Sequence, residues 1–248
     1  MRKHLYNTTI GKVPWFIKRF GAREMVLKPL RGILAPVIIP CLPKKTFQFR
    51  GKGFTCFYHR YNMTWAGERA VEIPIARSYL EQYPGRNILE VGNVLSHYFP
   101  IAHEVLDKFE RGEGIINEDI IAFRPAKQYD LILSISTFEH IGFDDEGEDS
   151  PGQKIREAIA ACRSHLKPDG KLVLTVPLGY NPELDRMIRN SELEAEAEFY
   201  MRRTRKLDWE MTDREEALRC PYKTRFPYAS AILVAEFGKA TRPKFGKG

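Results

Sequence analysis

The sequence predicts an α/β protein built on a mostly parallel, doubly wound β-sheet. From residue 87 onward, short apolar runs typical of strands alternate with segments long enough for helices or crossovers. The run YDLILSIS at residues 129–136 is apolar enough to be buried on both faces, as the strands of parallel sheets are. Repeated strand, crossover and strand predict a sheet covered by helices, with right-handed connections.

Seven strands are expected in chain order. They are residues 87–92, 104–107, 114–117, 129–136, 171–178, 198–204 and 230–238. Before the fifth strand, a helix is predicted from apolar residues at helical spacing, namely Ile155, Ala158, Ile159, Cys162 and Leu166. This helix should end at the turn KPDG, where Gly170 is placed to take a positive φ. A polar stretch around Trp209, without a crossover helix, separates the last two strands, so we expect them to pair antiparallel at the edge of the sheet.

Positive charge is concentrated at the beginning of the chain. The net charge is +7, but residues 1–52 carry twelve Lys or Arg against the single acid Glu24, a balance of +11. Residues 53–248 carry 27 basic and 31 acidic residues, a balance of −4. We therefore predict a basic, aromatic N-terminal arm at residues 1–52, followed by one α/β domain. An acidic domain without a basic groove disfavours a nucleic-acid partner.

The N-terminal arm combines Trp15, Phe16 and Phe20 with many Lys and Arg residues. Its most apolar run, residues 33–43, has eleven residues and three prolines, too few for the roughly 20 that a membrane-spanning helix needs. Two roles stay open. Residues 1–45 could lie on an anionic membrane surface as a peripheral contact, or the arm could pack on the protein's own core.

The cysteines favour a reducing, cytoplasmic setting, at the inner membrane surface if the arm binds lipid. Cys41, Cys56, Cys162 and Cys220 are far apart and form no C-x-x-C pair, which favours neither a zinc site nor a disulfide framework. The acid-rich stretch at residues 144–152 lacks the fixed ligand spacing of a calcium loop. No metal site is predicted.

Several segments together resemble the class I S-adenosylmethionine-dependent methyltransferases. The matching segments are ILEVG at residues 88–92, Asp107, the pair Glu118-Asp119, YDLILSISTFEHIG at 129–142 and LKPDGKLVLTVP at 166–177. More narrowly, EVGNVLSHY with VPLGYNPELD resembles an uncharacterised branch of methyltransferase-like proteins. The resemblance implies a Rossmann-like methyltransferase fold with an antiparallel last strand, a transferase activity, S-adenosyl-L-methionine as cofactor, and a catalytic domain at residues 53–248.

The resemblance also implies a cofactor site at the carboxyl ends of the strands, where ligands lie in open α/β sheets. The expected cofactor-binding residues are Glu90, Gly92, Asn93, Asp107, Asp119 and Ser134. Asp107 would accept hydrogen bonds from the ribose hydroxyls. Asp119 would lie near the adenine amino group, and Ser134 would lie under the methionine portion through its backbone.

The loop after the first strand departs from the usual glycine-rich pattern. Only Gly92 remains, although the neighbouring Asn93 tolerates a left-handed backbone better than most residues. The connection at residues 93–104 has twelve residues interrupted by Pro100, which leaves room for one or two helical turns. Either the cofactor binds with altered geometry, or the chain is a non-catalytic scaffold on the same sheet. A dehydrogenase is disfavoured because no G-x-G-x-x-G follows the strand.

The sequence gives less evidence for catalytic residues than for a cofactor site. Methyl transfer is a direct displacement, so a protein mainly aligns the reactants and sometimes removes a proton. His140 is the expected base, with helix packing or capping as its alternative role. Polar and aromatic residues crowd residues 57–74, which suits a small, saccharide-like acceptor or simply a helix with buried aromatics. Asn181, before Pro182, is expected to cap a helix. An RNA methyltransferase ranks below a small-molecule one, and the sequence indicates no oligomeric state.

Overall fold

The computed structural model describes residues 22–143, 151–223 and 228–239. Eight strands in these residues form one sheet in the order β5-β4-β3-β6-β7-β10-β8-β9. Their bounds are β3 Ile88–Val91, β4 Glu104–Leu106, β5 Ile115–Ile116, β6 Tyr129–Ile135, β7 Leu166–Pro177, β8 Ala197–Arg203, β9 Trp209–Thr212 and β10 Ala231–Gly238. The strands from β5 to β7 are parallel, which confirms the predicted mostly parallel α/β sheet.

The last strand is reversed, as predicted. β10 pairs antiparallel with β7 on one side and with β8 on the other. The predicted number of seven strands is one too few, because β9 adds an eighth at the edge, antiparallel to β8. Its four residues, WEMT, include two exposed side chains. A short edge strand of this kind lacks the apolar alternation on which a prediction from sequence depends.

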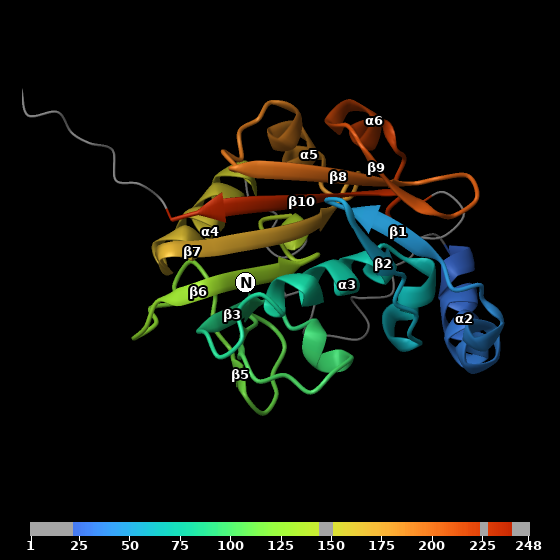
Figure 1. The fold of residues 1–248 in the computed structure, drawn as a ribbon, viewed down its shortest axis with the longest axis horizontal. Helices are drawn as coiled ribbons and strands as arrows, with labels where there is room; N and C mark the ends of the chain where they lie inside the picture. Colours follow the sequence, from blue (N-terminus) through green and yellow to red (C-terminus); the bar gives the residue numbers. More distant parts are fainter. Residues whose placement is uncertain (1–21, 144–150, 224–227, 240–248) are drawn as a thin grey trace, which may run out of the picture.

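Helices cover both faces of the sheet (Figure 1). One face packs against α4 (Pro151–Ser164), α5 (Pro182–Arg189) and α6 (Arg214–Arg219). The other packs against α3 (Arg69–Leu80) and the hairpin of β1 (Thr46–Phe49) and β2 (Lys52–Thr55). In β6, Ile132 belongs to the first core and Leu131 and Leu133 to the second. Successive residues of a strand point to opposite faces, so a doubly buried strand has to be apolar throughout.

Gly170 does not form the predicted turn. Helix α4 ends at Ser164, and β7 runs through the KPDG segment, with a register irregularity opposite Tyr129. The φ angle of Gly170 is not positive. A Cβ atom at Gly170 would lie 2.7 Å from the carbonyl oxygen of Tyr129 and 3.0 Å from the nitrogen of Lys167. Glycine is therefore required by the close approach of two backbone segments and not by left-handed backbone geometry.

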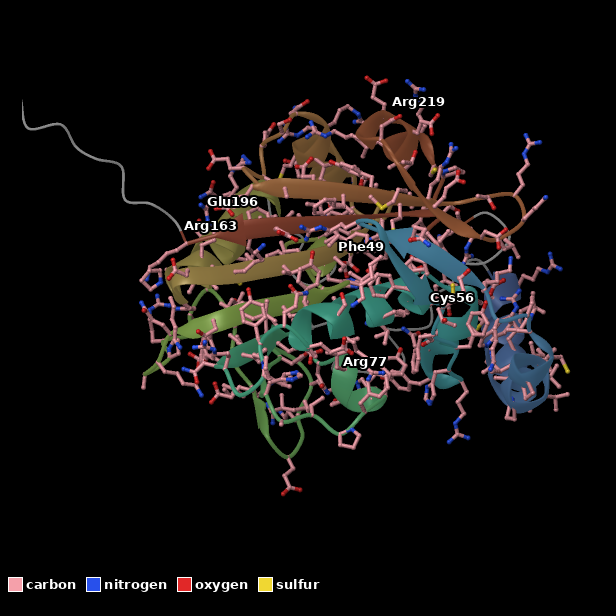
Figure 2. The ribbon with its side chains drawn as sticks, in the orientation of Figure 1. Phe49, Cys56, Arg77, Arg163, Glu196 and Arg219 are labelled. Carbon is pink, nitrogen blue, oxygen red and sulfur yellow. The ribbon has the colours of Figure 1, made fainter. Side chains whose placement is uncertain are left out.

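Within the N-terminal arm, residues 22–52 form helix α2 (Ala22–Cys41), strand β1 and the start of β2. Phe49 of β1 (Figure 2) is buried against the sheet. It packs edge-to-face on Phe199 of β8, with ring centroids 5.5 Å apart. The aromatic residues Trp15, Phe16 and Phe20 lie outside the described residues. Among the helices that the structure describes, none is long and apolar enough to cross a membrane.

Candidate functional site

A pocket of about 450 Å³ opens at the carboxyl ends of β3, β4 and β6. The chain runs from β3 outward to β4 and β5 on one side, whereas β6 and β7 lie on the other side of β3. Ligands bind at such switch points in open α/β sheets. The lining residues come from several loops and are Arg69, Val91, Gly92, Asn93, Val94, Leu106, Asp107, Lys108, Phe109, Glu110, Glu118, Asp119, Ile120, Ser136, Thr137, His140, Ile141, Gly142 and Lys154.

The predicted site residues divide into two groups. Gly92, Asn93, Asp107, Asp119 and His140 line the pocket. Glu90 and Ser134 are buried and are not among the lining residues. The hydroxyl of Ser134 donates to the carbonyl oxygen of Val91 at 2.7 Å, so this side chain ties β6 to β3.

Glu90 holds the glycine-poor loop after β3 from the protein interior. This fully buried carboxylate accepts hydrogen bonds at Oε1 from the N–H groups of Val94 (2.9 Å) and Leu95 (2.8 Å). Its Oε2 lies 2.8 Å from Nε2 of His103. A buried charge is tolerated where hydrogen bonds and a partner satisfy it. Glu90 therefore replaces, through its side chain, part of the support that a glycine-rich helix start would give.

The loop itself leaves the pocket open. It forms only one turn of 3-10 helix, η2 (Leu95–His97). Leu95 packs in the core, and the hydroxyl of Tyr98 pairs with the hydroxyl of Thr64 at 2.8 Å. Neither Leu95 nor Tyr98 lines the pocket. The hollow at the strand tips is thus preserved although the loop after β3 contains Gly92 as its one glycine.

Four successive backbone amides of this loop already donate within the chain. Gly92 N–H donates to the carbonyl oxygen of Leu106 (2.8 Å), and Asn93 N–H donates to Asp107 Oδ2 (2.9 Å). The N–H groups of Val94 and Leu95 donate to Glu90. An anionic ligand group usually binds such amides at the start of a helix. Here they are already occupied, so a ligand carboxylate would need a cationic side chain instead.

Asp107 and Glu110 present carboxylates at the tip of β4. Asp107 accepts from three backbone N–H groups, those of Asn93, Phe109 (2.8 Å) and Glu110 (2.7 Å). Since two carboxylate oxygens offer about four acceptor positions, roughly one remains for a ligand. Glu110 accepts from Nδ2 of Asn93 at 2.9 Å, and its carboxylate lies 3.3 Å from Nε2 of His97, which leaves about two acceptor positions free. Together they can accept hydrogen bonds from two neighbouring hydroxyl groups.

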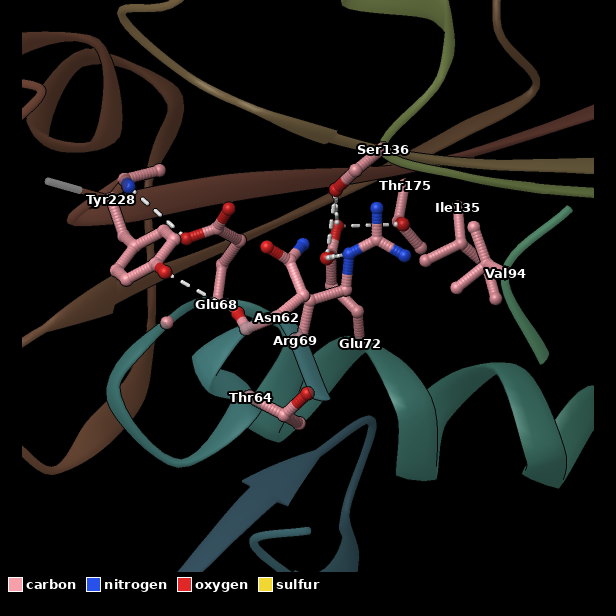
Figure 3. A network of polar contacts seen from close by, with 12 residues as sticks. Asn62, Thr64, Glu68, Arg69, Glu72, Val94, Ile135, Ser136, Thr175 and Tyr228 are labelled. Atoms are coloured by element: carbon pink, nitrogen blue, oxygen red, sulfur yellow. Dashed lines mark hydrogen bonds and ion pairs between the residues drawn. The ribbon is translucent and has the colours of Figure 1, made fainter. Parts of the chain in front are cut away.

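Arg69 brings a positive charge to the pocket from α3. Its guanidinium lies beside Glu72, Ser136 and Thr175 in a buried polar network (Figure 3), with 3.7 Å between Arg69 Nε and Glu72 Oε2. The hydroxyls of Ser136 and Thr175 donate to Glu72 Oε1 at 2.8 and 2.7 Å. Glu72 is fully buried. The network fixes Arg69 at the β6 side of the pocket.

Asp119 lies at the opposite side of the pocket, after β5. Its Oδ1 accepts from Ile121 N–H at 3.0 Å and its Oδ2 pairs with Lys108 Nζ at 3.0 Å. Burial opposes ionisation of Asp119, but the bond from Ile121 and the charge of Lys108 outweigh it and hold the pKa of Asp119 below its ordinary value. This carboxylate is therefore ionised, and it can accept from an amino group.

His140 lies at the end of a short 3-10 helix after β6, η3 (Phe138–His140), and lines the pocket. Its ring packs edge-to-face on Tyr180, with centroids 4.8 Å apart. Its Nε2 lies 3.4 Å from Oε1 of the preceding residue, Glu139. Burial raises the pKa of Glu139 to about 7, although the charge of His140 acts in the opposite direction. The His140 side chain is about one-third exposed and lines the pocket, so a ligand in the pocket can reach its ring.

The polar and aromatic stretch at residues 57–74 contributes both to the pocket and to the buried interior of the protein. Tyr61, on the 3-10 helix η1 (Tyr61–Ala66), stacks on His97 with centroids 4.4 Å apart and stays 43% exposed. Arg69 reaches the pocket, whereas Glu68 and Glu72 are buried. Burial and the charge of Glu72 raise the pKa of Glu68 to about 7. The stretch is thus both a wall of the site and a packed helix.

Asn181 caps α5, as predicted. Its Oδ1 accepts from Glu183 N–H (3.0 Å) and Leu184 N–H (3.2 Å), with Pro182 at the first helical position. The acid-rich segment at residues 144–150 lies outside the described residues. Among the residues that the structure does describe, no group of three or more His, Cys, Asp or Glu side chains could hold a metal ion.

The pocket residues that were not among the predicted site residues include three charged ones, Arg69, Glu110 and Lys154. Arg69 lies in the polar and aromatic stretch, but nothing there distinguishes it from its polar neighbours. Glu110 is three residues beyond Asp107, and Lys154 lies in the first turn of α4. No local pattern marks any of them, because each reaches the pocket only through the fold.

Comparison with known proteins gives similarities among solved structures only. No protein-family model matches this chain, and no curated protein matches it. The chain is 18% identical to N-methyltransferase NodS from Bradyrhizobium japonicum WM9, solved with S-adenosyl-L-homocysteine, with a TM-score of 0.44 over 70% of this chain and 88% of that one. It is 19% identical to a TehB-like SAM-dependent methyltransferase from Corynebacterium glutamicum, with a TM-score of 0.37 over 66% and 86% of the two chains.

A third similar structure is the sugar N-methyltransferase KedS8 from Streptoalloteichus, at 17% identity and a TM-score of 0.33 over 56% of this chain and 60% of that one. Because these three TM-scores all lie below 0.5, the similarities assign neither a family nor an activity to this chain.

Proposed function

We propose that the chain is an S-adenosylmethionine-dependent methyltransferase of the class I type, with residues 53–248 as its catalytic domain and a small molecule as methyl acceptor. One observation carries the proposal. The pocket of about 450 Å³ at the switch point of the sheet is lined by acids at one side and by Arg69 at the other. This volume is within the range of small-molecule sites.

The pocket residues fit the chemical groups of the cofactor. Asp107 and Glu110 can accept hydrogen bonds from the two ribose hydroxyls, and Asp119 can accept from the adenine amino group. Gly92, with φ of +89°, lets the backbone approach the ligand without a side chain in the way. These positions are supported by the lining of the pocket.

Arg69 is the candidate partner of the cofactor carboxylate. The loop amides that would otherwise bind an anion are occupied within the chain, as described above. Arg69 lines the pocket from α3, and its charge is held in place by the buried Glu72. A guanidinium can bind a carboxylate with two parallel hydrogen bonds, which adds orientation to affinity.

For catalysis, this chain would mainly align the reacting atoms. When bound, S-adenosylmethionine supplies an electrophilic methyl group on a sulfonium. His140 lies at the β6 side of the pocket and can take a proton from the attacking group of the acceptor. A hydroxyl acceptor needs this help because an alcohol is a much weaker nucleophile than its alkoxide. An ammonium acceptor needs it because the nitrogen has no free lone pair until a proton is removed.

We further propose a hydroxyl-rich, saccharide-like acceptor and a cytoplasmic site of action. The exposed ring of Tyr61 beside His97 offers a surface for stacking a sugar. The four cysteines are all free thiols, as is usual in a reducing compartment. A nucleic-acid acceptor is disfavoured by the acidic balance of residues 53–248.

Calorimetry tests the cofactor part of the proposal. Wild-type protein should bind both S-adenosylmethionine and S-adenosylhomocysteine, and Arg69→Met should weaken both by about tenfold or more. The same variant should bind methylthioadenosine as wild type does, because that nucleoside lacks the carboxylate. Absence of binding of any of the three by wild type would favour the scaffold alternative. Equal weakening of the binding of all three ligands by Arg69→Met would show that Arg69 does not bind the cofactor carboxylate.

Methyl transfer itself requires an acceptor. Fractionated metabolite pools incubated with a labelled methyl donor should yield a labelled small molecule with wild-type protein. His140→Asn should reduce the rate of transfer without changing donor affinity, and it should remove the dependence of the rate on pH near neutrality. Label that enters only RNA would instead support the RNA methyltransferase alternative.

A further inference from the structure

Helix α2 carries an apolar face that the described residues leave uncovered. Leu30, Ile33, Leu34 and Val37 are 45%, 74%, 44% and 69% exposed. Their spacing of three and four residues puts them on one side of the helix. Soluble proteins rarely expose contiguous apolar patches, and those that do usually use them for binding.

The opposite side of α2 is packed. Ala35 is fully buried, and Ile38 and Ile39 are partly buried. Arg31 and Glu24 form an ion pair of 2.6 Å with both side chains largely shielded. One side of the helix is therefore packed on the rest of the protein (Figure 1). The exposed apolar residues lie on the other side of this packed helix.

Among the described side chains, exposed positive charges lie at the two ends of this apolar face and not within it. Arg23 and Lys44 are exposed at either end of it. Between them, every exposed side chain that the structure describes is uncharged. Residues 1–52 as a whole carry +11. An apolar strip inside a strongly cationic segment complements a surface that has an apolar interior and negative charge outside.

We propose that the α2 face, defined by Leu30, Ile33, Leu34 and Val37, docks on an anionic lipid surface. The helix lies on the membrane and does not cross it. Pro29, Pro36 and Pro40 lie within the helix. Each proline leaves a carbonyl one turn earlier without its helical N–H partner. Water satisfies such carbonyls at the hydrated interface, whereas in the hydrocarbon interior each of them would need another hydrogen-bond donor. This inference is independent of methyl transfer.

Vesicle flotation of the full-length chain tests the proposal. Wild type should float with phosphatidylcholine vesicles that contain phosphatidylglycerol, and binding should fall with added salt and with phosphatidylcholine alone. Ile33→Asp/Val37→Asp should reduce binding by about tenfold or more. Met211→Asp is the matched control, since Met211 is an exposed apolar residue on β9, away from α2, at 39% exposure. It should float as wild type does.

A second variant tests the proposal even if Ile33→Asp/Val37→Asp does not fold. Arg23→Glu/Lys44→Glu leaves the apolar face intact and should also lose binding to anionic vesicles by about tenfold. The proposal fails if wild type does not float, or if Ile33→Asp/Val37→Asp floats unchanged. It also fails if this variant instead converts a dimer to a monomer, because the face would then serve a second copy. A lower melting temperature with unchanged flotation would show that the face packs against the chain itself.

Discussion

Gly92 and Thr137 lie in contact across the tips of β3 and β6. A Cβ atom added to Gly92 would overlap the hydroxyl and the methyl group of Thr137. Both residues line the pocket, and Gly92 has φ of +89°. The one glycine that remains in the loop is thus required twice, by its backbone conformation and by its neighbour.

Gly92→Ala should therefore destabilise the protein and impair cofactor binding. The positive φ alone costs about 1–2 kcal/mol, and displacement of Thr137 adds to it. Gly85→Ala is the control, since Gly85 has φ of +68° but no atom within 4 Å of an added Cβ. Urea unfolding should show a larger loss for Gly92→Ala than for Gly85→Ala. Adding Thr137→Ala to Gly92→Ala should recover part of the difference, whereas identical losses would disprove the contact.

Glu90→Leu should destabilise the protein by about 3–5 kcal/mol, because it leaves His103 and two loop amides without their buried partner. Glu104→Leu is a matched change on the next strand. Glu104 is 39% exposed and accepts from Tyr129, so its loss should cost about 1 kcal/mol. Chemical denaturation measures both. A small effect at Glu90 would contradict its role as the anchor of the loop.

Substitutions of Asp107 and Glu110 should have different effects on stability, although both should lower the affinity for the cofactor. The two carboxylate oxygens of Asp107 together accept from three backbone N–H groups. Asp107→Asn replaces one of these oxygens with an NH2 group, which cannot accept, so both stability and cofactor affinity should fall. Glu110→Gln should leave the free energy of unfolding within about 0.5 kcal/mol of wild type and lower affinity by about tenfold. Glu113→Gln, at an exposed position outside the pocket, should change neither. If Glu110→Gln binds the cofactor normally, Asp107 alone serves the ribose.

Glu139 should make stability depend on pH. Burial raises its pKa from 4.5 to about 7, so between these values the folded state holds a proton that the unfolded state releases. Its contribution is complete below pH 4.5 and is lost as the pH rises through 7, by on the order of 3 kcal/mol at pH 8.

Glu139→Gln cannot release this proton. Relative to wild type, it should lose less stability between pH 5 and pH 8 in melting experiments, while Glu113→Gln should follow wild type. Parallel pH profiles for wild type and Glu139→Gln would show that Glu139 is ionised throughout that range.

Local patterns were sufficient for most of the architecture. The apolar runs that became β3, β6 and β10 are buried strands, and Asn181 before Pro182 begins α5, because burial and capping depend on residues close in sequence. The turn expected at Gly170 was wrong, since that glycine is required by contact with Tyr129, some forty residues earlier. The edge strand β9 was missed because its exposed residues carry no apolar period.

The sequence by itself determined a mostly parallel sheet with a reversed last strand, a basic N-terminal segment and a loop with a single glycine at the first strand tip. Only the tertiary structure decided that Glu90 supports this loop from the core, that Arg69 and Glu110 join Asp107 around one pocket, and that one side of α2 stays exposed. The physical reason is distance along the chain. Periodicity and capping act within a few residues, whereas a pocket forms where strand order brings remote residues together.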